Sequence, residues 1–242
     1  MKKIFAANWK LHKNPKETRD FFTEWNKQFK HTNDKEVIFF PPATNLEATS
    51  TSLHATSTKW GAQNCYAEVK GAFTGETSAQ TVRDLGGHYI LIGHSERRSV
   101  FLENDNLIAK KVKLVQSLGL IPMLCIGETL PEREAGKTLQ VLKHQLEKGL
   151  SQADAQKHLV IAYEPVWAIG TGKVATPDQV QEAHAEIQKM VRGLGFSASL
   201  PLLYGGSVKP DNAKELISIP HVHGFLVGGA SLEVASFLQI CG

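Results

Sequence analysis

Three side chains suited to proton transfer each follow a short apolar run of the sequence. Glu164 comes directly after Val-Ile-Ala-Tyr, where burial would make its carboxylate a stronger base. His94 ends a second run, and a neutral imidazole there can donate a hydrogen bond to a carbonyl and pass on a proton. Lys10, after the first run, would supply fixed positive charge for a developing enolate. Each residue also has an ordinary interpretation, as a surface carboxylate, a structural imidazole or a solvated amine.

His94 differs from the other histidines because a helix is expected to follow it, with Ser95 as its cap. The positive end of the helix dipole disfavours an imidazolium, so we expect His94 to be neutral. The remaining histidines, His12 for example, are interpreted as structural or solvent-facing. His221 and His223 lie two residues apart, and because no Cys or Asp completes a set, no metal site is expected.

Glycine-rich turns follow the last three apolar runs, at 170–172, 205–207 and 228–230. Glycine lets backbone N–H groups approach a phosphate closely. One such turn is explained equally well as the end of a strand, but three in succession favour a phosphate site. The sequence therefore predicts a phosphate site at these turns.

Two glycine motifs resemble nucleotide-binding loops and are rejected. Gly-Lys-Thr at 136–138 is similar to the end of a P-loop, but Pro131 stands where that motif requires glycine. Gly-Thr-Gly at 170–172 begins like a dinucleotide fingerprint, but Ala175 occupies the third glycine position. We therefore expect no nucleotide cofactor.

The elements that position these residues follow a repeating pattern of short apolar runs separated by amphipathic stretches. Near-continuous apolar character over a few residues is typical of a strand buried on both faces of a parallel sheet. A doubly wound sheet is the competing architecture. Regular units without a linker favour an α/β fold: a single (β/α)8 barrel over residues 1–242, with eight parallel strands surrounded by helices. The runs begin at Ile4, Glu36, Lys59, Tyr89, Ile121, Leu159, Pro201 and Gly224.

Helical patterns occupy the stretches between the runs. Aromatic residues at helical spacing over 16–30 predict one amphipathic helix, and Thr176-Pro177 predicts the start of another. The region from Cys65 to Ala79 lacks periodicity and is expected to be a long loop. In a barrel of this kind the carboxyl ends of the strands form the site, so Asn8, Lys10, His94 and Glu164 should meet at one rim.

Composition excludes several classes of protein. The excess of basic over acidic residues is only +3, which is too small to indicate nucleic acid. Three sparse cysteines, Cys65, Cys125 and Cys241, argue against a disulfide framework, and Cys125 is interpreted as a packed residue rather than a nucleophile. The first residues lack the apolar region of a signal peptide, and no apolar stretch is long enough to span a bilayer. A cytoplasmic protein without a membrane partner is expected.

The motifs that carry the candidate residues resemble the triosephosphate isomerase family along essentially the whole chain. The resemblance implies a TIM barrel that interconverts glyceraldehyde 3-phosphate and dihydroxyacetone phosphate through an enediolate, as in glycolysis and gluconeogenesis, with no cofactor. The matching stretches are, in order, AANWK, GAFTGE, GHSERR, CIGE, AYEPVWAIGTG, YGGSV and LVGGAS.

Roles for individual residues follow from the resemblance. Glu164 would be the base, and neutral His94 would be the electrophile that polarises the carbonyl. Lys10 and Asn8 would hold and place the substrate, and Glu96 would support these residues without touching the substrate. The phosphate would lie against the N–H groups of Gly170, Ser207, Gly228 and Gly229. The stretch 165–175 would be a lid that excludes water. The loop that carries Thr74 would dock into the neighbouring subunit of a homodimer.

The chain departs from the family pattern at two positions. Pro201 stands where a basic residue is frequent, and His223 stands where Asp is usual. We interpret the two losses as linked, the removal of both ends of one ion pair, with more effect on stability than on chemistry. Two other functions compete: a different phosphosugar isomerase on a barrel, and a barrel that binds phosphate or a partner without catalysis. The second predicts loss of Glu164, His94 or Lys10, and all three are present.

Overall fold

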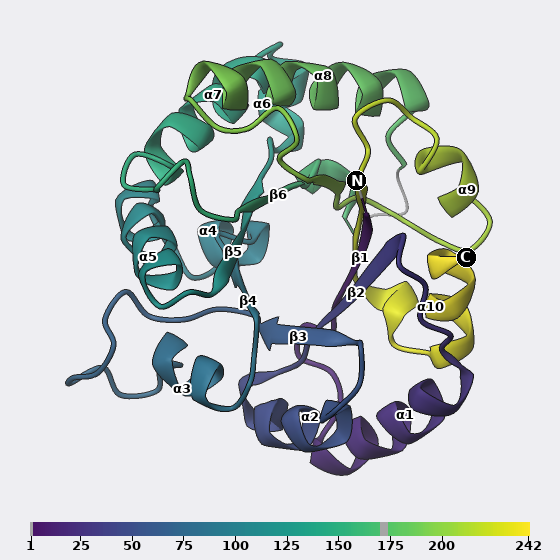
Figure 1. Cartoon of the computed structure of the whole chain (residues 1–242). Coiled ribbons are helices and arrows are strands. Elements are labelled where there is room, and N and C mark those ends of the chain that lie inside the picture. The colour runs from purple at the N-terminus through teal and green to yellow at the C-terminus, as the bar shows by residue number, and fades with distance from the viewer. Residues whose placement is uncertain (1, 170–173) are drawn as a thin grey trace.

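Eight parallel strands form a closed barrel with helices around it in the computed structural model, which describes residues 2–169 and 174–242 (Figure 1). The strands pair in chain order, and β8 closes the barrel on β1. Every predicted apolar run forms a strand, so the prediction of a (β/α)8 barrel is confirmed. The strands are β1 (Lys3–Asn8), β2 (Lys35–Phe40), β3 (Lys59–Ala62), β4 (Tyr89–Ile92), β5 (Ile121–Ile126), β6 (Val160–Tyr163), β7 (Leu202–Tyr204) and β8 (Gly224–Val227).

The strands are apolar on both faces because both faces are buried. Successive side chains of a strand point to opposite sides. In β2, Ile38 and Phe40 belong to the cluster that fills the barrel, whereas Val37 and Phe39 belong to the cluster between strands and helices. The near-continuous runs of the sequence therefore reflect two separate cores.

Helices form the outer ring, and several begin where the sequence predicts. Thr176 accepts a hydrogen bond from the N–H of Gln179, and Pro177 takes the first helical position. The described α-helices are α1 (Pro15–Gln28), α2 (Leu46–Leu53), α3 (Ala79–Asp84), α4 (Ser95–Ser99), α5 (Asp105–Ser117), α6 (Leu130–Glu134), α7 (Thr138–Gly149), α8 (Pro177–Gly193), α9 (Ala213–Leu216) and α10 (Val234–Cys241). Single turns of 3-10 helix are η1 (Ala43–Asn45), η2 (Val166–Ala168) and η3 (Gly229–Ser231).

Trp9 anchors the end of β1 in an aromatic cluster. Its ring stacks on Phe22 of α1 at 5.3 Å between centroids, and its Nε1 donates to the carbonyl of Ser231 at 3.2 Å. Because Trp9 is fully buried, its neighbours Asn8 and Lys10 are held at the mouth of the barrel. The predicted aromatic stripe over 16–30 is confirmed, since it supplies the α1 side of this cluster.

The segment between β3 and α3 contains no helix or strand, as predicted, and it projects from the barrel beside α3 (Figure 1). Within it the rings of Tyr66 and Phe73 lie 4.2 Å apart, and Thr74 is exposed. Among the residues that the structure describes, no helix has the length and apolar character needed to cross a membrane.

The two departures from the family pattern lie at the start of neighbouring strands, β7 and β8. The N–H of Leu202, next to Pro201, donates to Nδ1 of His223 at 3.1 Å. Burial, together with the charge of Lys3, lowers the pKa of His223 to about 4, so a neutral ring accepts this bond. This contact places His223 against the residue that follows Pro201, and the linked loss of an ion pair stays a prediction.

Candidate active site

A cavity of about 390 Å³ lies at the carboxyl ends of the strands. It brings together residues that are far apart in the sequence, from the ends of β1, β4, β6, β7 and β8. Of the predicted site residues, its lining includes Asn8, Lys10, His94, Glu164, Ser207, Gly228 and Gly229. Gly170 lies outside the described residues, as do residues 171–173 of the predicted lid.

Glu164 is almost completely buried, with both carboxylate oxygens engaged. Oε2 accepts a hydrogen bond from the N–H of Ser95 at 3.0 Å, and Oε1 lies 3.0 Å from Nε2 of His94. Burial raises the pKa of Glu164, but the contacts with His94 and with the Ser95 N–H outweigh burial, and the pKa is lowered overall. The expectation that burial would make this carboxylate a stronger base is therefore wrong for the arrangement seen here.

His94 itself caps α4, and Ser95 is the first helical residue, so the prediction of Ser95 as cap is wrong. The N–H of Glu96 donates to Nδ1 of His94 at 3.2 Å. Nδ1 can accept this bond only without a proton, which places the single proton of a neutral ring on Nε2, facing Glu164. Since α4 has only five residues, this particular N–H matters more than a helix dipole.

Two opposing influences act on the charge of His94. Burial lowers its pKa, while the neighbouring carboxylate of Glu164 raises it, and the net direction is upward. That upward direction depends on the contact with Glu164. Were the carboxylate to turn away, burial and the N–H of Glu96 would both favour the neutral imidazole.

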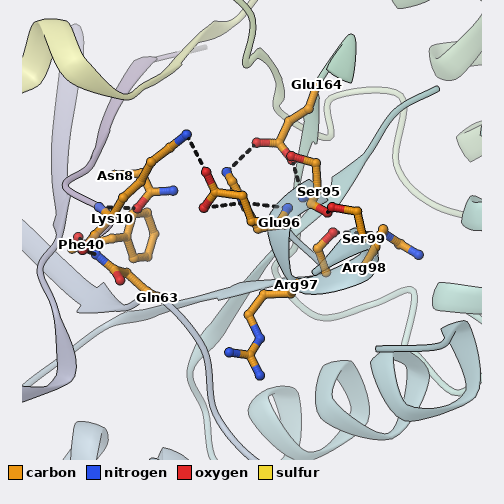
Figure 2. Close-up of polar contacts among 12 residues, drawn as sticks. Asn8, Lys10, Phe40, Gln63, Ser95, Glu96, Arg97, Arg98, Ser99 and Glu164 are labelled. Atoms are coloured by element: carbon orange, nitrogen blue, oxygen red, sulfur yellow. Dashed lines mark hydrogen bonds and ion pairs between the residues drawn. The ribbon is translucent and has the colours of Figure 1, made fainter. Parts of the chain in front are cut away.

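Lys10 approaches the cavity from the opposite wall and pairs with Glu96 (Figure 2). Its Nζ lies 2.7 Å from Oε1 of Glu96, and the other carboxylate oxygen lies 3.5 Å from Nδ1 of His94. The backbone of Lys10 has φ +50°, a region that non-glycine residues seldom adopt. The side chain of Asn8 accepts from the Lys10 N–H at 3.0 Å, and Gln63 donates to the Lys10 carbonyl at 2.8 Å, so both neighbours hold this turn.

The glycine turn after β8 leaves the backbone open to the cavity. A Cβ added at Gly229 would meet no protein atom within 4 Å, and one added at Gly228 would meet only Cε of Lys10, at 3.7 Å. Together with Ser207 after β7, these residues form one wall of the cavity. Such a wall suits an anion that is recognised by backbone N–H groups.

Glu128 is a functional candidate that the sequence interpretation missed. It is fully buried and lies just beyond β5, where it accepts hydrogen bonds from the hydroxyl of Tyr163 at 3.2 Å and from Nε1 of Trp167 at 2.9 Å. Arg133 completes the group, with its Nη1 3.0 Å from the carboxylate. The available signal was its place in CIGE, directly after an apolar run, as for Glu164.

No three His, Cys, Asp or Glu side chains gather as a metal-binding group in residues 2–169 and 174–242. Cys125 is fully buried inside the barrel, in agreement with its interpretation as a packed residue. Burial also raises the pKa of its thiol well above the usual value.

Comparison with known proteins matches the chain over its whole length. The sequence profile of the family described as "Triosephosphate isomerase" covers residues 3–242. A protein named triosephosphate isomerase from Bdellovibrio bacteriovorus is 64% identical, with 99% of each chain covered. Proteins of that name from Fusobacterium nucleatum, 43% identical over 98% of this chain and 96% of the relative, and from Aquifex aeolicus, 42% identical over 99% and 98%, are also similar.

Proposed function

The chain belongs to the triosephosphate isomerase family and is an isomerase, and on that premise we propose which residues interconvert glyceraldehyde 3-phosphate and dihydroxyacetone phosphate. Glu164 takes a proton from the carbon next to the substrate carbonyl, and His94 donates a hydrogen bond to the carbonyl oxygen. The observation that carries this assignment is the direct contact of Glu164 with Nε2 of His94 in one buried wall of the cavity.

Both groups must change partners when substrate binds. Oε1 of Glu164 leaves Nε2 of His94, and the carbonyl oxygen of the substrate takes its place. With the carboxylate turned toward carbon, the main influence that raises the pKa of His94 is weakened, and burial favours the neutral imidazole that the reaction requires. The same move frees Glu164 from the contact that holds its own pKa down. The pair therefore becomes more reactive only with substrate present.

The remaining residues stabilise charge and position. Lys10 places positive charge beside the developing enediolate, and Glu96 holds the Lys10 amine in place. Asn8 supports the Lys10 backbone. The backbone of Ser207, Gly228 and Gly229 holds the phosphate, with Gly170 as a further ligand. Since only protons move, the reaction needs neither metal nor nucleotide. We also infer that residues 1–242 form one domain of a cytoplasmic protein.

The first test is conversion of glyceraldehyde 3-phosphate by the purified chain without added metal or nucleotide. Product is followed with a coupled reduction of dihydroxyacetone phosphate. Rapid turnover that persists after treatment with a chelator supports the proposal. A folded chain without turnover would contradict it and would favour a barrel that binds phosphate without catalysis.

The pH dependence of activity should report the contact between Glu164 and His94. Because the pKa of Glu164 is lowered, the carboxylate persists to lower pH, and kcat/KM should fall only as the pH drops through that lowered value. In His94→Gln the burial that raises the pKa remains while a main lowering influence is lost, so the acid limb should move to higher pH. The substrate phosphate titrates equally in both assays, and the ratio of the two profiles removes its contribution. A limb that stays in place or moves to lower pH would contradict the assignment.

We also propose a homodimer, because an apolar surface lies beside the cavity. Leu11 is 95% exposed, and Phe101 and Leu102 of the segment after α4 are 61% and 79% exposed. A second cavity of about 330 Å³, lined by Leu11, Phe101, Lys10 and Glu96, opens there toward the proposed site. The projecting loop around Thr74 on a second copy of the chain is the occupant that we infer.

Sedimentation equilibrium should give a dimer for the unaltered chain and a monomer with reduced kcat for Phe73→Arg, a change in the projecting loop. Phe73 is 37% exposed, and Leu194, at the end of α8, is 36% exposed and provides a matched control. Leu194→Arg should remain dimeric and active. Dissociation in both variants, or in neither, would argue against docking by this loop.

A further inference from the structure

Strand β5 extends beyond its neighbour β4 at the site. The two strands pair from Tyr89 with Ile121 to Ile92 with Leu124, after which the chain of β4 turns away into α4. In a parallel ladder, alternate residues bond to opposite neighbours. Since the carbonyl of Ile126 bonds toward β6, the backbone groups of Cys125 and Gly127 point to the side that β4 has left.

Two side chains replace the missing strand. Arg98 donates from Nη2 to the carbonyl of Cys125 at 3.2 Å. Gln145, from α7, serves both polar groups of Gly127: its Oε1 accepts from the N–H at 2.8 Å, and its Nε2 donates to the carbonyl at 3.1 Å. Backbone groups left without partners away from water are costly, so these bonds determine where the end of β5 lies.

The segment held by Gln145 supports the proposed base directly. The carbonyl of Ile126 accepts from the N–H of Glu164 at 2.7 Å, and the carbonyl of Glu128 accepts from the N–H of Val166 at 3.0 Å. Between them, Gly127 packs so closely that an added Cβ would overlap the carbonyl of Glu164. Because hydrogen bonds on both sides of Gly127 join the two segments, a shift of Gly127 is expected to carry the backbone of Glu164 with it.

Packing alone does not hold this segment. A separate cavity of about 190 Å³ lies on the outer side of Glu164, lined by Gln145, Gly127, Arg98 and Ser95 among others. Without the carboxamide of Gln145, the end of β5 has open space into which it can relax. Hydrogen bonds rather than van der Waals contact thus set the position of Gly127 on this side.

We propose that Gln145 is a positioning residue for the reaction, acting through Gly127 to place the backbone of Glu164 and Val166. The proposal rests on the function proposed above for Glu164. Gln145 lies on α7, outside the main cavity lining, whereas the described phosphate ligands of the proposal come from the turns after β7 and β8. Its loss should therefore impair the chemical step and largely spare substrate binding.

The chain contains a matched control for this test. Gln116, on α5, binds the N–H of Asp154 at 2.9 Å and the carbonyl of Asp154 at 3.1 Å. This is the same pair of bonds to one residue, and neither Gln116 nor Asp154 lines the main cavity. Gln116→Leu and Gln145→Leu remove equivalent interactions, and both should lower the melting temperature.

Steady-state kinetics of the two variants decide the question. A displacement near 1 Å can cost about 10²-fold in rate, so Gln145→Leu should lower kcat by roughly 10- to 100-fold with KM within about threefold. Gln116→Leu should keep kcat within about twofold of the unaltered chain. Equal kcat in the two variants, or a loss confined to KM in Gln145→Leu, would overturn the proposal.

A second variant, Gln145→Glu, keeps the test decisive if Gln145→Leu does not fold. A carboxylate accepts from the Gly127 N–H but cannot donate to its carbonyl, whereas a carboxylic acid does both. The kcat of Gln145→Glu relative to the unaltered chain should therefore rise as the pH falls, and a flat ratio would overturn the proposal. Of the charged groups lining the same cavity, Arg98 and Glu132 are common to both proteins, and the ratio is taken above the acid limb of each profile so that titration of Glu164 does not enter it.

Amide hydrogen exchange separates this inference from the proposed function. The N–H of Glu164 should exchange faster in Gln145→Leu than in Gln116→Leu, whatever the substrate of the protein. An unaltered chain without turnover but with this difference would refute the proposed function while supporting the positioning role. Equal exchange in the two variants would overturn the positioning role.

Discussion

Replacement of Glu164 by glutamine is expected to lower kcat by roughly 10²- to 10⁴-fold, the usual contribution of a positioned general base. The carboxamide has the same shape and can still accept the bond from the Ser95 N–H, so the wall of the cavity should persist. It cannot take a proton from carbon at neutral pH. Because the proposed phosphate ligands lie elsewhere, KM should change by only a few-fold.

A half-buried carboxylate at the other end of the barrel provides the control for Glu164→Gln. Glu36, on β2, accepts a hydrogen bond from the hydroxyl of Tyr89, and an amide oxygen can accept the same bond. Glu36→Gln should keep kcat within about twofold. A Glu164→Gln protein that folds and retains more than about a tenth of the activity would exclude Glu164 as the base.

The same substitution has a consequence for stability that carries a definite sign. The pKa of Glu164 is lowered in the folded protein, so its carboxylate adds stability above the pKa of the unfolded chain. That contribution is lost as the pH falls through the folded value. Denaturant unfolding at a series of acidic pH values should show a steeper loss of stability for the unaltered chain than for Glu164→Gln.

Replacement of Lys10 by methionine is expected to lower kcat/KM by about 10²- to 10³-fold, the range for loss of a fixed group that stabilises developing negative charge. Methionine keeps much of the aliphatic stem, so the packing of the side chain is largely retained. Removal of the amine also leaves Glu96 without its partner at 2.7 Å, close to His94. We expect kcat to fall and KM to rise, because a positive charge attracts both the bound substrate and the enediolate.

Lys16 provides the comparison for Lys10→Met. It also pairs with a carboxylate, that of Asp20 at 2.6 Å, but on the solvent-facing side of α1, where its side chain is 80% exposed. Lys16→Met should leave kcat/KM unchanged at any ionic strength. Full activity in Lys10→Met would exclude an electrostatic role, and a similar loss in both variants would indicate a general effect of net charge.

Much of the site was predictable because the fold itself gathers strand ends. Eight apolar runs of strand length specify a parallel sheet buried on both faces, and in a closed barrel all carboxyl ends meet at one rim. Residues that directly follow those runs, such as Asn8, Lys10, His94 and Glu164, must then share that rim whatever their separation along the chain. The sequence order of strand, polar residue and helix was therefore enough to identify them.

The tertiary structure alone decided how those residues act on one another. Glu164 contacts His94 and the Ser95 N–H, which lie some seventy positions away in the chain. No local sequence pattern therefore indicates that these contacts lower the pKa of Glu164 by more than burial raises it. The sequence gives no sign of a role for Gln145 either, because it is one of several polar residues on an amphipathic helix. Its bonds to Gly127 exist because β5 is longer than β4, a difference in length that appears only once the strands are paired. Hydrogen bonds and pKa shifts depend on distances of an ångström, whereas apolar periodicity specifies only which face of an element is buried.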